Sequence, residues 1–222
     1  KKKDNMIEFI QGIISFILHI DTHLTELISA YGALTYAILF AIVFAETGFV
    51  VTPFLPGDSL LFAAGALAAL GTMNVWMIVG ILFIAAVLGD AANYWIGHFF
   101  GKKIIESKNF PLIKKDHIDE AQEFYEKHGG KAIILSRFVP IVRTFAPFVA
   151  GVGRMDYTKF LMYNVVGGAV WIMLFTFAGF FFGNIPSVKD NFTLVILGII
   201  FISVVPIVIE TIKSKKKKSK KE

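Results

Sequence analysis

The stretch ETGFVVTPFLPGD, residues 46–58, interrupts a chain that is strongly apolar on both sides. YGALTYAILFAIVFA precedes it and SLLFAAGALAAL follows it. Proline removes a backbone donor and clashes with the preceding helical turn, and unpaired backbone groups cannot face lipid. We therefore expect the break, which contains Pro53 and Pro56, to be buried in protein or to line a wet cavity.

The composition indicates an integral membrane protein. Of 222 residues, 55% are hydrophobic and only 18% are charged, and the mean hydropathy is +0.66. This is more apolar surface than one small soluble core could bury. The absence of cysteine excludes disulfides, thiolate metal sites and a cysteine nucleophile. The basic start KKKDNMIEFI is not interpreted as a cleaved signal peptide, because no small-residue cleavage site follows it.

Three blocks are long enough to span a membrane as single helices, since a hydrocarbon core of about 30 Å needs about 20 apolar residues. They are residues 73–97, 157–183 and 192–212. Two further apolar stretches, 31–70 and 132–152, have prolines in their middle. Both are predicted to be re-entrant hairpins.

The placement of lysines predicts the orientation. The link 98–131 and the C-terminal run KSKKKKSKKE are both lysine-rich, so both are expected in the cytoplasm, with the tail near anionic lipid. The chain then divides into an N-terminal amphipathic segment, 1–30, a membrane domain, 31–212, and a polybasic cytoplasmic tail, 213–222.

The order of the blocks predicts an all-α membrane fold built as an inverted repeat. Each half has an amphipathic helix, a proline-broken hairpin and a full span: 6–30, 31–70 and 73–97, then 116–129, 130–152 and 157–183. Asp116 is expected to N-cap the second amphipathic helix, and Gly129 and Gly130 to end it. The two hairpins enter from opposite sides, an arrangement that forms substrate sites in secondary transporters.

Four charged residues are expected where the hairpins meet. The first hairpin offers Glu46 and Asp58, and the second offers Arg137 and Arg143. A buried acid is costly in a membrane, which favours a functional role for Glu46. Asp58 precedes a helical run, so an N-cap role is expected whatever else it does.

The two arginines suit an anionic ligand, because a guanidinium makes two-point contacts with phosphate or carboxylate oxygens. Arg137 and Arg143 would lie on roughly opposite faces of a continuous helix. Pro140 lies between them, so we expect a break that lets both turn to one site. The alternative is an internal ion pair with Glu46 or Asp58. The two interpretations are compatible if the pair opens when substrate arrives.

Three polar residues inside the predicted spans are secondary candidates. Asp90 and Asn93 lie near the end of one span, where a polar patch against the second half is as well supported as contact with substrate. Asn164 precedes Trp171 by seven residues on one helix face, and helix packing is the favoured interpretation of both. His98, His117 and His128 are expected to be solvated. No metal site and no cofactor are predicted.

Three stretches resemble the DedA family of bacterial membrane proteins, which is related to eukaryotic proteins with a VTT (SNARE-associated) domain. They are FAETGFVVTPFLPGDSLLFAAG, GDAANYWIGHFFGKK and FYEKHGGKAIILSRFVPIVRTFAPFVAGVGRM. Together with Asn164, Trp171 and Gly179 they cover most of residues 44–183.

The resemblance implies that Glu46 and Asp58 are the family's essential acidic pair, and that Arg137 and Arg143 are its essential arginines. It also implies lipid translocation in a bacterial plasma membrane. Members are described as flipping polyprenyl phosphate carriers, chiefly undecaprenyl phosphate, to the cytoplasmic leaflet, with dependence on the proton motive force. Relatives are described as moving phospholipids.

The leading hypothesis is therefore a lipid transporter. The two arginines hold an anionic headgroup while its tail stays in lipid, and protonation of Glu46 or Asp58 would release the arginines from internal pairs. A flippase or scramblase for phospholipids, such as phosphatidylethanolamine, is the nearest alternative. Expected partners are the anionic lipid, membrane lipids and, in a homo-oligomer, further copies of the chain; no nucleic acid is expected.

An enzyme, a membrane lipid phosphatase, is the less favoured class. SRFVPIVRT superficially resembles the phosphatase signature SRxxxxxHxxxD. However, Arg143 stands where the nucleophilic histidine is needed, and a guanidinium that stays protonated cannot attack phosphorus.

Overall fold

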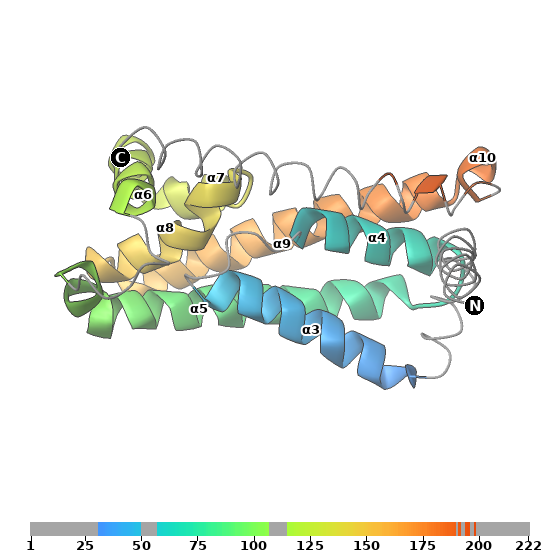
Figure 1. The fold of residues 1–222 in the computed structure, drawn as a ribbon, viewed down its shortest axis with the longest axis horizontal. Helices are drawn as coiled ribbons and strands as arrows, with labels where there is room; N and C mark the ends of the chain where they lie inside the picture. Colours follow the sequence, from blue (N-terminus) through green and yellow to red (C-terminus); the bar gives the residue numbers. More distant parts are fainter. Residues whose placement is uncertain are drawn as a thin grey trace, which may run out of the picture. The chain divides into compact units, whose positions relative to one another are not determined.

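The computed structural model describes residues 31–49, 57–106, 115–189, 191, 194, 195 and 198, and every element that these residues form is helical (Figure 1). The predicted N-terminal segment 1–30, most of the predicted span 192–212 and the tail 213–222 lie outside the described residues. The same holds for the proline-containing break at 50–56 and the basic loop at 107–114.

The chain folds into two compact units. The first holds α4 (Gly57–Ala69) from Asp58 onward, the last turns of α9 (Tyr157–Gly183) and α10 (Pro186–Lys189). The second holds nearly all of α3 (Ala33–Gly48) and α5 (Val75–Glu106), together with α6 (Lys115–His128), the 3-10 helix η1 (Gly129–Lys131), α7 (Ala132–Ser136), α8 (Pro140–Val152) and the rest of α9.

Two of the described helices are long and apolar enough to cross a membrane: residues Val75–Gly101 of α5 and the whole of α9. The limits of α9 agree with the predicted span 157–183. The helix α5 extends well beyond the predicted end at residue 97. No proline follows there, and the glycines in this region weaken a helix without ending it.

Both proline-containing stretches are broken, as predicted. In the first, α3 ends at Gly48 and α4 begins at Gly57. In the second, residues 137–139 separate α7 from α8, and Val139 is extended, with φ −117° and ψ 105°. A following proline imposes this conformation, and Pro140 then suits the first turn of α8. The re-entrant placement and the inverted repeat stay predictions.

The amphipathic helix α6 agrees with the expected pattern except at its start. It begins one residue before Asp116, which therefore lies inside the helix and not at its N-cap. Gly129 follows the helix with φ +59°, a left-handed conformation that costs a glycine little. Ala121 is buried, and Phe124 and Tyr125 are partly buried against the core, because they form one face of the helix.

The core of the second unit joins α5 to α9, α6, α7 and α8. Its buried members are Tyr94, Ala121, Ile133, Val142, Phe145, Ala146, Phe148, Val149, Ala150 and Phe160. The ring of Tyr94 stacks on that of Phe160 with 4.5 Å between centroids, and its hydroxyl donates a hydrogen bond to the carbonyl of Met155. A buried tyrosine needs such an acceptor for its hydroxyl.

The first unit is held by close packing of α4 against the last turns of α9. A Cβ added at Gly65 would lie 2.0 Å from the carbonyl oxygen of Thr176. One added at Gly179 would lie 2.0 Å from that of Phe62. Small residues bring helix backbones together in membrane proteins, where lipid provides no hydrophobic drive for helices to associate.

We predict that Gly151→Ala destabilises the second unit by about 1–3 kcal/mol. A Cβ there would lie 2.0 Å from the carbonyl oxygen of Tyr94, so α8 and α5 would have to move apart. The control is Gly80→Ala, where a Cβ would meet nothing within 4 Å. Thermal unfolding in detergent should show a lower midpoint for Gly151→Ala alone; equal midpoints for the two variants would contradict this packing.

Candidate functional site

The break between α7 and α8 brings two arginines to one tryptophan ring. Arg137 follows directly after α7, and Arg143 lies in the first turn of α8. Their guanidinium carbons lie 5.6 and 5.5 Å from the ring centroid of Trp171, a cation–π distance. The interpretation of Trp171 as a helix-packing residue missed this contact. The contact depends on Trp171 lying opposite the break between α7 and α8, and the sequence does not give that position.

Arg137 is held by two side chains from neighbouring helices. Its Nη2 lies 2.5 Å from Oδ2 of Asp90 on α5 and donates a second hydrogen bond, of 2.6 Å, to Oδ1 of Asn164 on α9. Asn164 in turn donates to the carbonyl of Val87 at 3.0 Å. The alternative stated from the sequence, an internal pair with Glu46 or Asp58, does not describe Arg137, because Asp90 faces this arginine from the adjacent helix.

The backbone of α9 leaves room for this guanidinium. A Cβ at Gly167 would lie 3.3 Å from both Cδ and Nε of Arg137. The Nε atom is buried and has no hydrogen-bond acceptor among the described residues. An unsatisfied buried N–H is costly, so this donor is suited to an oxygen of a ligand. The consecutive glycines at 167 and 168, in the middle of an apolar span, are the sequence signal for this space.

Arg143 forms the second ion pair of the site. Its Nη2 donates to Oε1 of Glu46, in the last turn of α3. A Cβ at Gly57 would lie 2.1 Å from the other carboxylate oxygen of Glu46, so only a glycine can precede Asp58 here. The structure thus shows, for Arg143, the internal ion pair with Glu46 that the sequence left as an alternative.

Asn93 fixes the helices that carry these pairs. It is fully buried, and its Nδ2 donates to the carbonyls of Thr47 on α3, at 3.0 Å, and Thr144 on α8, at 2.8 Å. The close approach at Gly89 of α5 brings α3 into range, since a Cβ there would lie 1.9 Å from Oγ1 of Thr47. Asn93 was interpreted from the sequence either as part of a polar patch against the second half of the chain or as a contact to substrate. These hydrogen bonds support the polar patch.

Asp58 belongs to the first unit, whereas Glu46, Arg137 and Arg143 belong to the second. It lies in the first turn of α4, one residue after the helix begins, and is partly buried. It is therefore not the N-cap that the sequence suggested. A carboxylate in the first turn still interacts favourably with the helix dipole.

The charged cluster is defined here as Glu46, Asp90, Arg137 and Arg143. Its two cations and two anions cancel in formal charge. All four side chains are largely removed from solvent, with Arg143 the most exposed at 11%. Taking four charges out of water is costly even when they are paired. Such a cluster is weak evidence of stability and stronger evidence of a site.

The described residues contain no group of three or more His, Cys, Asp or Glu side chains that could hold a metal ion. The expectation that the histidines are solvated was wrong for His98 and for His128, which is partly buried with its ring 4.3 Å from that of Phe124. The side chain of His117 lies outside the described residues. His98 lies in an aromatic group. Its ring is partly buried and lies edge-on to those of Trp95 and Phe99. The extension of α5 beyond the predicted span places it within this aromatic group.

The comparison with known families matches residues 55–181 to the VTT domain. The chain is also 58% identical over 212 residues to Protein DedA of Escherichia coli strain K12, covering 95% of this chain and 97% of that protein. This chain belongs to the DedA family.

Further relatives are more distant. The chain is 43% identical over 168 residues to an uncharacterized membrane protein of Mycobacterium leprae, covering 76% of this chain and 75% of the relative. It is 32% identical over 151 residues to the inner membrane protein YqjA of Escherichia coli strain K12, covering 68% and 69%. No solved structure matches. The names of these relatives and the two apolar helices identify this DedA-family chain as a membrane protein.

Proposed function

We propose that this protein moves an anionic lipid between the leaflets of a bacterial plasma membrane, and that the lipid is a polyprenyl phosphate such as undecaprenyl phosphate. The observation that supports this is the pair of buried arginines against Trp171, in a protein with two helices able to cross a membrane. In a membrane protein, buried cations mark substrate or ion pathways. The basic tail, 213–222, is then placed on the cytoplasmic side.

The two arginines have different roles in this proposal. Arg137 is fixed by Asp90 and Asn164 and offers its Nε to an oxygen of the phosphate. Arg143 is more exposed, at 11% against 4% for the Arg137 side chain, and has Glu46 as its carboxylate partner. A phosphate group competes with Glu46 for Arg143, because both are anionic oxygen acceptors of the same geometry.

The balance of charge couples this exchange to a proton. The charged cluster is neutral, so a bound phosphate monoanion adds one uncompensated negative charge in a poorly solvated place. Protonation of Glu46 restores neutrality and at the same time releases Arg143. We therefore propose that one proton accompanies each anionic headgroup through the site.

We propose transport rather than hydrolysis as the chemistry of the site. The side chains of the charged cluster are carboxylates and guanidinium groups. A guanidinium cannot act as a nucleophile. Both carboxylates of the cluster face arginines. An anionic ligand can replace a carboxylate as the partner of an arginine, but neither carboxylate is placed as a general base beside a hydroxyl or an imidazole of the cluster.

The experiment is a flipping assay in liposomes with labelled undecaprenyl phosphate and labelled phosphatidylethanolamine in parallel. We predict that the wild type moves the polyprenyl phosphate with a rate that depends on pH. Glu46→Gln removes the titratable group and gives the charged cluster one permanent excess positive charge, so transport should be lost while the protein still inserts. The matched control is Glu123→Gln, at an exposed carboxylate of α6.

Normal transport by Glu46→Gln at every pH tested would rule out proton coupling through this residue. Equal transport of both labelled lipids by the wild type would favour the phospholipid flippase or scramblase instead. Release of inorganic phosphate from the labelled lipid would favour the phosphatase.

A further inference from the structure

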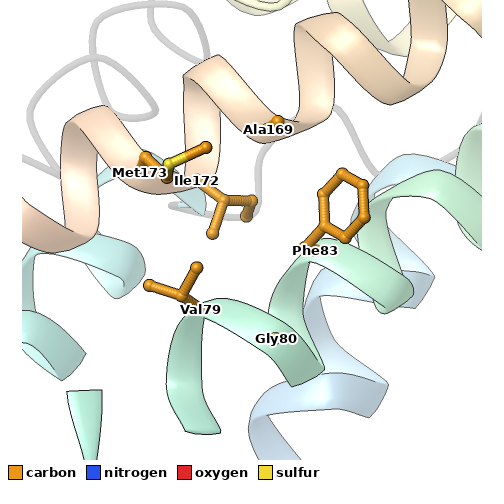
Figure 2. Close-up of a pocket in the computed structure, with 6 residues that line it drawn as sticks. All are labelled: Val79, Gly80, Phe83, Ala169, Ile172 and Met173. Atoms are coloured by element: carbon orange, nitrogen blue, oxygen red, sulfur yellow. The ribbon is translucent and has the colours of Figure 1, made fainter. Parts of the chain in front are cut away.

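A groove of about 170 Å³ lies between α5 and α9 in the second unit (Figure 2). Its six lining residues are all apolar: Val79, Gly80, Phe83, Ala169, Ile172 and Met173. In Figure 2 the side chains of Val79 and Phe83 on α5 point towards Ile172 on α9. A site without polar partners does not hold water well, so its ligand should be hydrocarbon.

The mouth of the groove opens on the apolar surface of the two helices able to cross a membrane. Gly80 is exposed, and Met173 is 44% exposed. Further along the same helices, Ile84 and Leu174 are about half exposed. An exposed apolar surface on membrane-crossing helices faces lipid, so hydrocarbon chains can enter the groove from the side.

The groove adjoins the charged cluster at Gly168. A Cβ added at this glycine would lie 3.6 Å from Cε2 of Phe83, which lines the groove, and 3.5 Å from Nη2 of Arg137. No side chain from this position separates the guanidinium from the groove. On the same helix Ile172 lines the groove, and its neighbour Trp171 contacts both arginines. The groove and the charged cluster are therefore neighbours on α9, in contact around Gly168 and Val87.

We propose that the groove binds the hydrocarbon chain of the lipid whose anionic headgroup occupies the charged cluster. This inference rests on the proposed function and refines it. A cavity of about 150 Å³ lined by apolar side chains accepts benzene, so this groove has room for one isoprene unit or a short run of methylenes. The rest of the chain stays in the membrane. This revises the expectation that the whole tail remains in lipid.

The groove fixes the position of the lipid more than it strengthens binding. Moving hydrocarbon from lipid into protein gives little hydrophobic free energy, because the two environments are equally apolar. What the groove adds is van der Waals contact with the chain next to the phosphate. That contact orients the headgroup towards the arginines.

Gly80→Leu tests the groove directly. A Cβ at this position meets nothing within 4 Å, so the leucine side chain begins in open space beside the groove, and leucine favours the helix more than glycine does. We expect the affinity for a long-chain polyprenyl phosphate to fall about threefold to tenfold through lost chain contacts. The affinity for inorganic phosphate, which has no chain, should not change.

The matched control is Val170→Phe. Val170 lies on α9 beside the groove residue Ala169, is 46% exposed and does not line the groove. The added ring enlarges the same helix at the same depth, so binding of both probes should equal that of the wild type. Binding is measured by titration of the full-length, detergent-solubilised protein and followed by tryptophan fluorescence.

A second measurement locates the chain. A polyprenyl phosphate with a photoreactive group on its first isoprene unit is irradiated with the full-length protein in liposomes. We expect labelling of the α5 and α9 peptides that contain Gly80 and Met173, and less of it in Gly80→Leu. Labelling spread evenly over the lipid-facing helices would overturn the proposal.

The outcomes separate the groove from the proposed function. If the wild type and Gly80→Leu bind polyprenyl phosphate equally, the groove is wrong and the headgroup site stands. If Gly80→Leu weakens inorganic phosphate as well, the substitution acts on the charged cluster and the groove is again overturned. If the wild type binds neither probe, the proposed function fails and the chain site fails with it.

Discussion

Arg137→Met is expected to lower the free energy of unfolding by about 3–5 kcal/mol, because it leaves a buried carboxylate without its cation. Asp90 is only 4% exposed. Its oxygen Oδ2 faces the guanidinium that the substitution removes. Methionine fills a similar volume, so the loss reflects charge more than packing. The measurement is unfolding of the purified protein in detergent, followed by tryptophan fluorescence and by resistance to proteolysis.

A second substitution separates this cause from a simple packing defect. Arg137→Met combined with Asp90→Leu removes both charges, and replacing a whole buried pair by apolar residues is often neutral or stabilising. We expect the double variant to recover most of the lost stability and still fail to transport lipid. The control is Lys159→Met, which removes an exposed cation from α9. If the double variant is no more stable than Arg137→Met, the ion pair is not what stabilises this region.

Arg143→Lys is expected to leave the fold intact and to weaken binding of polyprenyl phosphate about tenfold or more, because lysine keeps the charge but loses the planar two-point donor. Arg143 is the less buried arginine and has Glu46 as its partner. One ammonium group can still balance that carboxylate. If the residue only neutralised Glu46, lysine should serve nearly as well.

Arg137→Lys is the informative comparison. Both substitutions should weaken the binding of undecaprenyl phosphate to detergent-solubilised protein, and we expect the larger effect at Arg143, since Arg137 is already engaged by Asp90 and Asn164. Equal affinities of the wild type and both lysine variants would refute the headgroup clamp. The arginines would then be structural counter-ions.

The sequence alone determined the helical class, the limits of α9 and the two breaks. These features depend on local chemistry. The largely apolar stretch 157–183 contains no proline, and in a membrane it forms a helix because its backbone groups must pair within the segment. Pro140 forces its predecessor out of helical geometry. The sequence also identified the charged residues, because carboxylates and guanidinium groups stand out inside apolar segments. The limit of α5 was missed, because the predicted span was bounded by the length of its apolar block and the helix continues beyond that block to Glu106.

Only the tertiary structure decided which charges meet. Arg137 pairs with Asp90, 47 residues away along the chain, and not with either acid of the first broken stretch. Which partner it meets depends on the rotation of α5 and α9 against the α7–α8 break. That rotation is set by long-range contacts, such as the close approach at Gly89 and the hydrogen bonds of Asn93. The role of Trp171 and the groove beside Gly168 follow from the same rotation. No local sequence pattern encodes this rotation, because the residues in contact lie far apart in the chain, at spacings unrelated to the period of a helix.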